Sequence, residues 1–68
     1  MNGKQFIRQS RKWASASGHR LTVEKSRGKG GHQIVRIGER WTTVKTGEIG
    51  AGLLAAMLND LGIPKGEF

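Results

Sequence analysis

A histidine closes the most basic and most glycine-rich stretch of this 68-residue chain, residues 27–32. An imidazole takes up or releases a proton near neutral pH, because its unperturbed pKa is about 6.5. Glycine-rich loops let successive backbone N–H groups converge on an anion, and lysine and arginine add full positive charges. We therefore predict that His32 is the reactive group and that the stretch before it holds a phosphate. The predicted phosphate-binding residues in this stretch are Arg27, Lys29, Gly30 and Gly31.

The chemistry available to an imidazole beside a phosphate is cleavage of RNA without a metal. A base that removes the proton of the 2′-hydroxyl lets that oxygen attack phosphorus and leaves a cyclic phosphate. Arg36 joins the cations of the stretch as a candidate for stabilising the charge that develops. His19, the other histidine, can donate the second proton only if its turn lies near His32. We expect His19 to be a solvated turn residue instead.

Metal-dependent chemistry is disfavoured by the residue types. Hard divalent cations need clustered carboxylates, and the five Asp and Glu residues are scattered along the chain. The chain has two histidines and no cysteine, which argues against a zinc site and excludes disulfides. We expect no metal and no other cofactor.

Charge is unevenly distributed along the chain. The formal net charge is +7, and eleven of the twelve Lys and Arg residues lie at or before Lys45. Such a basic region attracts polyanions, so nucleic acid or a protein with an acidic face is the expected partner. Lys12, in the basic N-terminal segment, is a further candidate for binding RNA phosphates. The sequence has neither the apolar run of a signal peptide nor the roughly 18 apolar residues of a membrane span, so we expect a cytoplasmic protein.

The elements that must position these residues can be predicted from periodicity. Helical spacing of apolar residues, with Ser10 and Ser17 on the same stripe, predicts a helix over residues 4–17. Asn2 should cap it in a capping box with Gln5. Gly18 should end this helix. Alternating apolar and polar residues predict three strands. The predicted strands are residues 21–25, 32–37 and 40–45.

The second half of the chain should complete one α+β domain. Gly38 and Glu39 suit a two-residue type II′ turn between the last two strands. A leucine-rich helix is predicted over residues 51–61, with Leu53, Leu54, Met57, Leu58 and Leu61 on its buried side. Gly62 and Ile63 should end this helix, and residues 65–68 should form a frayed tail. The order α-β-β-β-α predicts a single domain over residues 1–68, with a three-stranded antiparallel sheet and two helices on one face.

Period-two alternation also predicts which side chains share a face of the sheet. If Val35 and Ile37 face the helices, then His32 and Arg36 lie together on the open face. Trp13 should anchor the core, a role that we favour over base stacking.

Several stretches together resemble the HicA toxins, also called the YcfA-like family. They are Gly28-Lys29-Gly30-Gly31-His32, Thr42-Thr43-Val44, the glycine-led segment 48–54 and the segment 57–63. The resemblance covers nearly the whole chain. It implies a small version of the double-stranded-RNA-binding fold. It also implies a bacterial toxin that cleaves messenger RNA, blocks translation and is neutralised in a complex with a HicB-like antitoxin.

The resemblance implies that His32 corresponds to the catalytic histidine of the family's Gly-Ser-His signature. The chain departs from the signature at Gly31, where the family usually has serine. It also has Lys45-Thr46-Gly47 where many members have proline and a further histidine. Two other functions stay open: a non-catalytic RNA-binding module and a basic module that binds an acidic protein.

Overall fold

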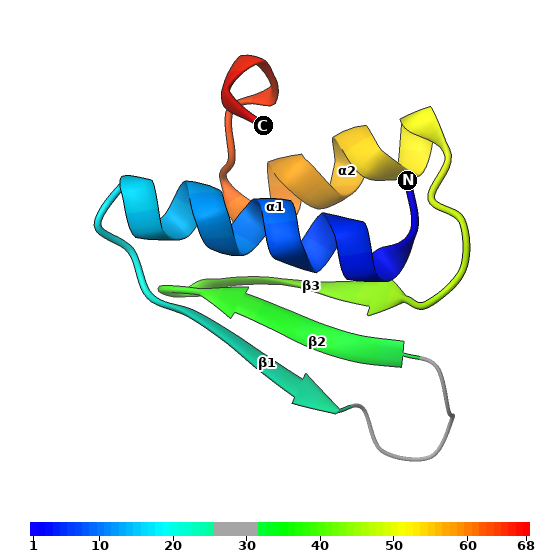
Figure 1. Cartoon of the computed structure of the whole chain (residues 1–68), viewed down its shortest axis with the longest axis horizontal. Helices are drawn as coiled ribbons and strands as arrows, with labels where there is room; N and C mark the ends of the chain where they lie inside the picture. The colour runs from blue at the N-terminus through cyan, green and yellow to red at the C-terminus, as the bar shows by residue number, and fades with distance from the viewer. Residues whose placement is uncertain (26–31) are drawn as a thin grey trace.

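The computed structural model describes residues 1–25 and 32–68. Two helices and three strands follow one another in the predicted order α-β-β-β-α, and a short 3₁₀ turn ends the chain (Figure 1). The predicted bounds of the three strands and of the second helix are confirmed, and the first helix lies one residue nearer the N-terminus than predicted. The elements are α1 (Gly3–Ala16), β1 (Leu21–Lys25), β2 (His32–Ile37), β3 (Arg40–Lys45), α2 (Ala51–Leu61) and η1 (Lys65–Glu67).

The ends of α1 follow the predicted chemistry. The Asn2 side chain accepts a hydrogen bond from the Gln5 N–H, and the Gln5 side chain accepts one from the Asn2 N–H, both at 2.9 Å. This reciprocal capping box satisfies two N–H groups that a helix leaves without partners. Gly18 has a φ of 75°, a left-handed conformation that stops the helix. Ser17 therefore falls outside α1, where it is exposed, while Ser10 is fully buried.

The three strands form one antiparallel sheet in the order β1-β2-β3. Ile37 pairs with Arg40, so the connection between β2 and β3 has the predicted two residues. Gly38 has a φ of 60°, and no other residue type has positive φ within the described ranges. This combination agrees with the predicted type II′ turn, because a type I′ turn would need positive φ at Glu39 as well.

One face of the sheet holds the core, and both helices cover it (Figure 1). Val35 lies at the centre of β2 with no exposed surface, and Val44 on β3 is almost as buried. Phe6 of α1 and Met57 and Leu61 of α2 are the largest buried side chains above this face. The predicted two-layer α+β arrangement is therefore confirmed.

The apolar side of α2 is narrower than predicted. Met57, Leu58 and Leu61 are buried and Leu54 is partly buried, but Leu53 is 42% exposed. Leu53 lines a hollow beside β3 instead of entering the core, so its predicted burial is wrong. The predicted helix end is confirmed: Gly62 is left-handed, and Ile63 is buried with its N–H bonded to the Leu58 carbonyl at 2.9 Å.

The C-terminal segment is not a frayed tail, which corrects the prediction. Residues 65–67 form η1, and the ring of Phe68 lies 5.4 Å from the ring of Phe6, centroid to centroid. The Gln9 side chain donates a hydrogen bond to the Phe68 carbonyl, and the Trp13 indole donates one to Glu67 at 3.0 Å. These contacts join residues more than fifty positions apart, which no local sequence pattern encodes.

Trp13 packs against the core only at its rim. Its side chain is partly buried, and its ring stacks on His19 with centroids 5.5 Å apart.

Neither α1 nor α2 has the length and apolar character needed to cross a membrane.

Gly3, at the start of α1, lies directly against the end of β3. A Cβ atom at this position would collide with the Lys45 carbonyl oxygen, which is backbone and does not move away easily. Next to this contact, the Ile49 N–H donates to the Met1 carbonyl at 2.7 Å, and Glu48 forms an ion pair with the Met1 amino group. Because Gly3 has no side chain, the start of α1 can lie directly against the last residue of β3.

We expect Gly3→Ala to lower the free energy of unfolding by about 1–3 kcal/mol, because the added methyl group overpacks this contact. Urea denaturation followed by far-UV circular dichroism measures the change.

Gly52→Ala is the matched control, since Gly52 also lies in a helix and no atom stands within 4 Å of a Cβ built there. We expect it to raise the free energy of unfolding by up to about 1 kcal/mol through helix propensity. Equal effects of the two substitutions would contradict the close packing at Gly3.

Candidate functional site

His32 begins β2 and lies on the open face of the sheet. Val35 and Ile37 are buried against the helices, so alternation places His32, Ile34 and Arg36 on the opposite face. The His32 side chain is exposed, whereas Arg36 is partly exposed. The face predicted for His32 and Arg36 is confirmed, and the imidazole is accessible to a ligand from solvent.

Lys45 is the direct cross-strand partner of His32, which sequence analysis did not select. The register pairs His32 on β2 with Lys45 on β3, and side chains opposite each other in such a pair have Cβ atoms roughly 5 Å apart. The Lys45 side chain is exposed on the same face. Counting back along both strands from the Gly38-Glu39 turn would have identified this pair, because a two-residue turn fixes the register.

Arg36 lies on the same face as His32, farther along β2. Its guanidinium stands 3.8 Å from the Glu24 carboxylate of β1, with 43% of the Arg36 side chain and 57% of the Glu24 side chain exposed. An exposed ion pair at this distance contributes little to the stability of the fold and is screened by salt. Arg36 can therefore exchange the Glu24 carboxylate for the phosphate of a ligand at small cost.

His19 lies at the other end of the sheet from His32. It precedes β1, whose first residue Leu21 pairs with Ile37, and it lines a hollow with Ile37 and Gly38. His32 is at the opposite end of β2, paired with Lys45. His19 is exposed and stacks on Trp13, so it is a turn residue as predicted and cannot donate a proton beside His32.

The predicted phosphate-binding residues do not all fall within one described site. Arg27, Lys29, Gly30 and Gly31 lie outside the described residues. Lys12 is exposed on α1, in the helical layer, whereas His32 and Arg36 lie on the sheet face that the helices leave open. Lys12 therefore belongs to a second basic surface.

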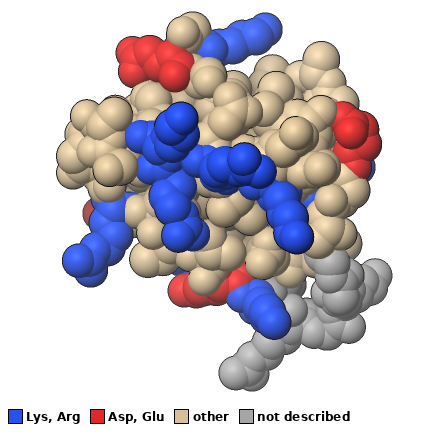
Figure 2. All heavy atoms as spheres, in the orientation of Figure 1, with Lys and Arg blue, Asp and Glu red and all other residues tan. Residues whose placement is uncertain are grey.

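That second surface is a basic stripe along α1, formed by Lys4, Arg8, Arg11 and Lys12. Their spacing places them close together on the solvent side of the helix, opposite Phe6 and Ala14. Figure 2 shows Lys and Arg side chains in a row over α1. Among the described residues, neither of the two ion pairs involves this stripe, so its charges face solvent.

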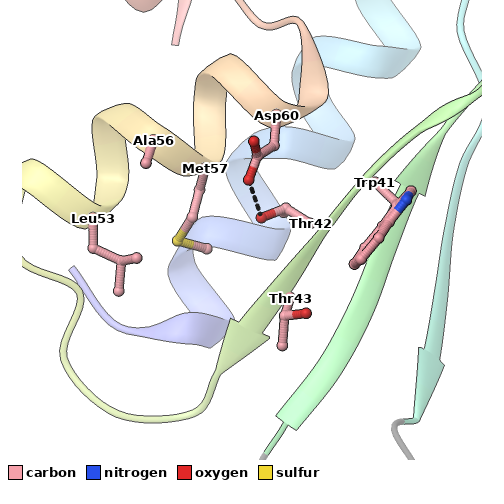
Figure 3. Close-up of a pocket in the computed structure, with 7 residues that line it drawn as sticks. All are labelled: Trp41, Thr42, Thr43, Leu53, Ala56, Met57 and Asp60. Carbon is pink, nitrogen blue, oxygen red and sulfur yellow. Dashed lines mark hydrogen bonds between the residues drawn. The ribbon is translucent and has the colours of Figure 1, made fainter.

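A hollow of about 490 Å³ lies at the free edge of β3, between this strand and α2 (Figure 3). Thr42 points toward α2, where its hydroxyl donates to Asp60 at 3.2 Å. Trp41 and Thr43 project from the other side of β3. His32 is not among the residues that line this hollow.

No group of three His, Asp or Glu side chains within the described residues is arranged to hold a metal ion.

Comparison of the chain with protein-family models, with curated proteins and with solved structures gives no match.

If RNA binds along the stripe, Arg8→Gln should weaken its binding and make the salt dependence shallower, because one cation that can contact a phosphate is removed. For a single-stranded RNA, the slope of log K against log salt should fall by about 0.7 in magnitude. Fluorescence anisotropy over a series of salt concentrations measures this slope.

Lys65→Gln removes the same charge from η1, which packs beside Phe6 and Trp13 of α1 but is not part of the stripe, and serves as the control. An equal loss of slope in both variants would mean that net charge, and not the stripe, governs binding.

Proposed function

We propose that this chain is a metal-independent endoribonuclease that cleaves messenger RNA, and that it acts in the cytoplasm as a toxin of the HicA type. One observation carries the proposal: an exposed imidazole, His32, directly opposite an exposed ammonium, Lys45, on a sheet face with no helix over it. A general base and a cation beside it supply two of the roles that metal-free RNA cleavage needs, proton removal and charge stabilisation. The net charge of +7 favours a polyanionic substrate.

His32 acts as the base in this mechanism. Its neutral imidazole removes the proton of a 2′-hydroxyl, and the freed oxygen attacks the adjacent phosphorus in line with the 5′ oxygen. The new bond to the 2′ oxygen forms as the bond to the 5′ oxygen breaks, which yields a 2′,3′-cyclic phosphate and a 5′-hydroxyl. The leaving oxygen takes its proton from water, since His19 is at the other end of the sheet.

Lys45 stabilises the charge on the phosphorane. The register of β2 and β3 places its Cα atom beside that of His32, so the ammonium can reach a phosphate bound at the imidazole. Arg36, on the same face, binds a neighbouring phosphate once it leaves Glu24. The basic stripe on α1 is available to parts of the RNA that extend over the helical layer.

We expect His32→Ala to lower the rate of cleavage at least a hundredfold, which is the lower range for the loss of a general base. The measurement is incubation of a single-stranded RNA with the protein in EDTA, with fragment ends identified by mass spectrometry. The wild-type protein should produce 2′,3′-cyclic phosphate ends.

His19→Ala is the matched control, because it removes the other exposed histidine and should keep full activity. Lys45→Gln should slow cleavage and leave the fragment ends unchanged. Binding without cleavage by the wild-type protein would instead support a non-catalytic RNA-binding module. Cleavage that stops in EDTA would contradict the metal-free mechanism.

We further propose that a HicB-like antitoxin with an acidic face forms a hetero-oligomeric complex with this chain and covers His32. The excess of exposed basic side chains supports a partner of opposite charge. We expect the purified complex to cleave RNA more than tenfold more slowly than the free chain. Equal rates would mean that the partner binds elsewhere, and absence of a complex would contradict the proposed partner.

A further inference from the structure

Trp41 is the most exposed large apolar side chain among the described residues, with 53% of its surface accessible. It lies on β3 and alternates with the buried Thr42, so its indole stands on the open face of the sheet. In Figure 3 the ring points away from the side of β3 that faces α2. The core does not use this ring, and burial of so large an aromatic surface by a ligand would be favourable.

A cationic side chain lies next to Trp41, on the same face of the sheet as His32. Arg36 is its direct partner across the β2–β3 pair, and His32 precedes Arg36 by four residues on the same face. At roughly 3.4 Å per residue, the imidazole and the Trp41 row are about 14 Å apart along the sheet. Between them lie Ile34 and Thr43, an uncharged pair.

We infer that the open sheet face binds single-stranded RNA, with one unpaired base stacked on Trp41 and its phosphate near Arg36. The inference rests on the proposed nuclease function and names its substrate class. A strand held at Trp41 and running along β2 reaches His32 within a few nucleotides, so the stacked base fixes which bond meets the imidazole.

Two properties of the face favour RNA over an apolar protein surface. The Trp41 ring does not belong to the core, and the Arg36 guanidinium is on the residue opposite it. A nucleotide has a flat base that can stack on the ring and a phosphate that can pair with the guanidinium. Among described residues of this face, the cations Arg36 and Lys45 outnumber the single carboxylate of Glu24. The phosphate backbone therefore meets a surface of complementary charge.

The same geometry selects single strands over duplexes. A base can stack on Trp41 only if its own face is free, and bases inside a duplex are covered by their neighbours. The second tryptophan cannot take this role, because Trp13 is partly buried, donates to Glu67 and already stacks on His19.

Binding is measured in the His32→Ala protein, so that RNA stays intact whether or not the wild-type chain is a nuclease. The probes are a short single-stranded RNA and a duplex that contains the same sequence. We expect Trp41→Leu to weaken binding of the single strand about tenfold or more and to leave duplex binding nearly unchanged. Trp41→Phe should recover part of the loss, since it keeps a ring.

Leu53→Ala is the matched control, because Leu53 is the other large exposed apolar side chain. It lies on α2 and lines the hollow between β3 and α2 that Trp41 also lines. We expect it to leave the affinity for both RNAs unchanged. In the Trp13→Phe background Trp41 is the sole tryptophan, so single-stranded RNA should quench its fluorescence and the duplex should not.

An unchanged single-strand affinity in Trp41→Leu would overturn the inference, and so would equal losses for single strand and duplex. A Trp41→Phe protein as weak as Trp41→Leu would also overturn it, because stacking needs only an aromatic face. Failure of the proposed nuclease is seen separately, as intact RNA with the wild-type protein.

Discussion

The pairing of β2 with β3 is the constraint on which the arrangement of this chain depends. The two-residue turn at Gly38 and Glu39 leaves one register, which places Val35 opposite Thr42 under the helices. A slip by one residue would move Val35 to solvent and would turn His32 toward the helical layer. The free energy gained by burying one sheet face therefore also determines which side chains the other face presents.

The packing around this sheet uses segments that are far apart in the sequence. Phe68 and Glu67 return to α1 at the end of the chain, while Ile49 is buried in the connection between β3 and α2. At the other end of α1, Gly3 allows the helix to start against the Lys45 carbonyl. A small domain buries a limited share of its surface, so these peripheral contacts form a large part of its tertiary structure.

Positive charge is divided between two surfaces with different geometry. The basic stripe on α1 is convex and helical, and it suits contacts with phosphates irrespective of sequence. The open sheet face combines cations with an imidazole and an exposed indole, so it offers both electrostatic and stacking contacts to an unpaired strand. The α+β core separates the two surfaces, so a long polyanion would have two surfaces to bind and one at which the proposed chemistry would take place.

Much of this fold was determined by local patterns in the sequence. Alternation gave the strands, apolar spacing gave the helices, and Asn2, Gly18 and Gly62 gave their ends, because each acts on neighbouring backbone groups. Only tertiary structure exposed Leu53 and folded residues 65–68 onto α1. It also separated Lys12 and His19 from the imidazole, since the distance between side chains on different elements depends on packing and not on their order in the chain.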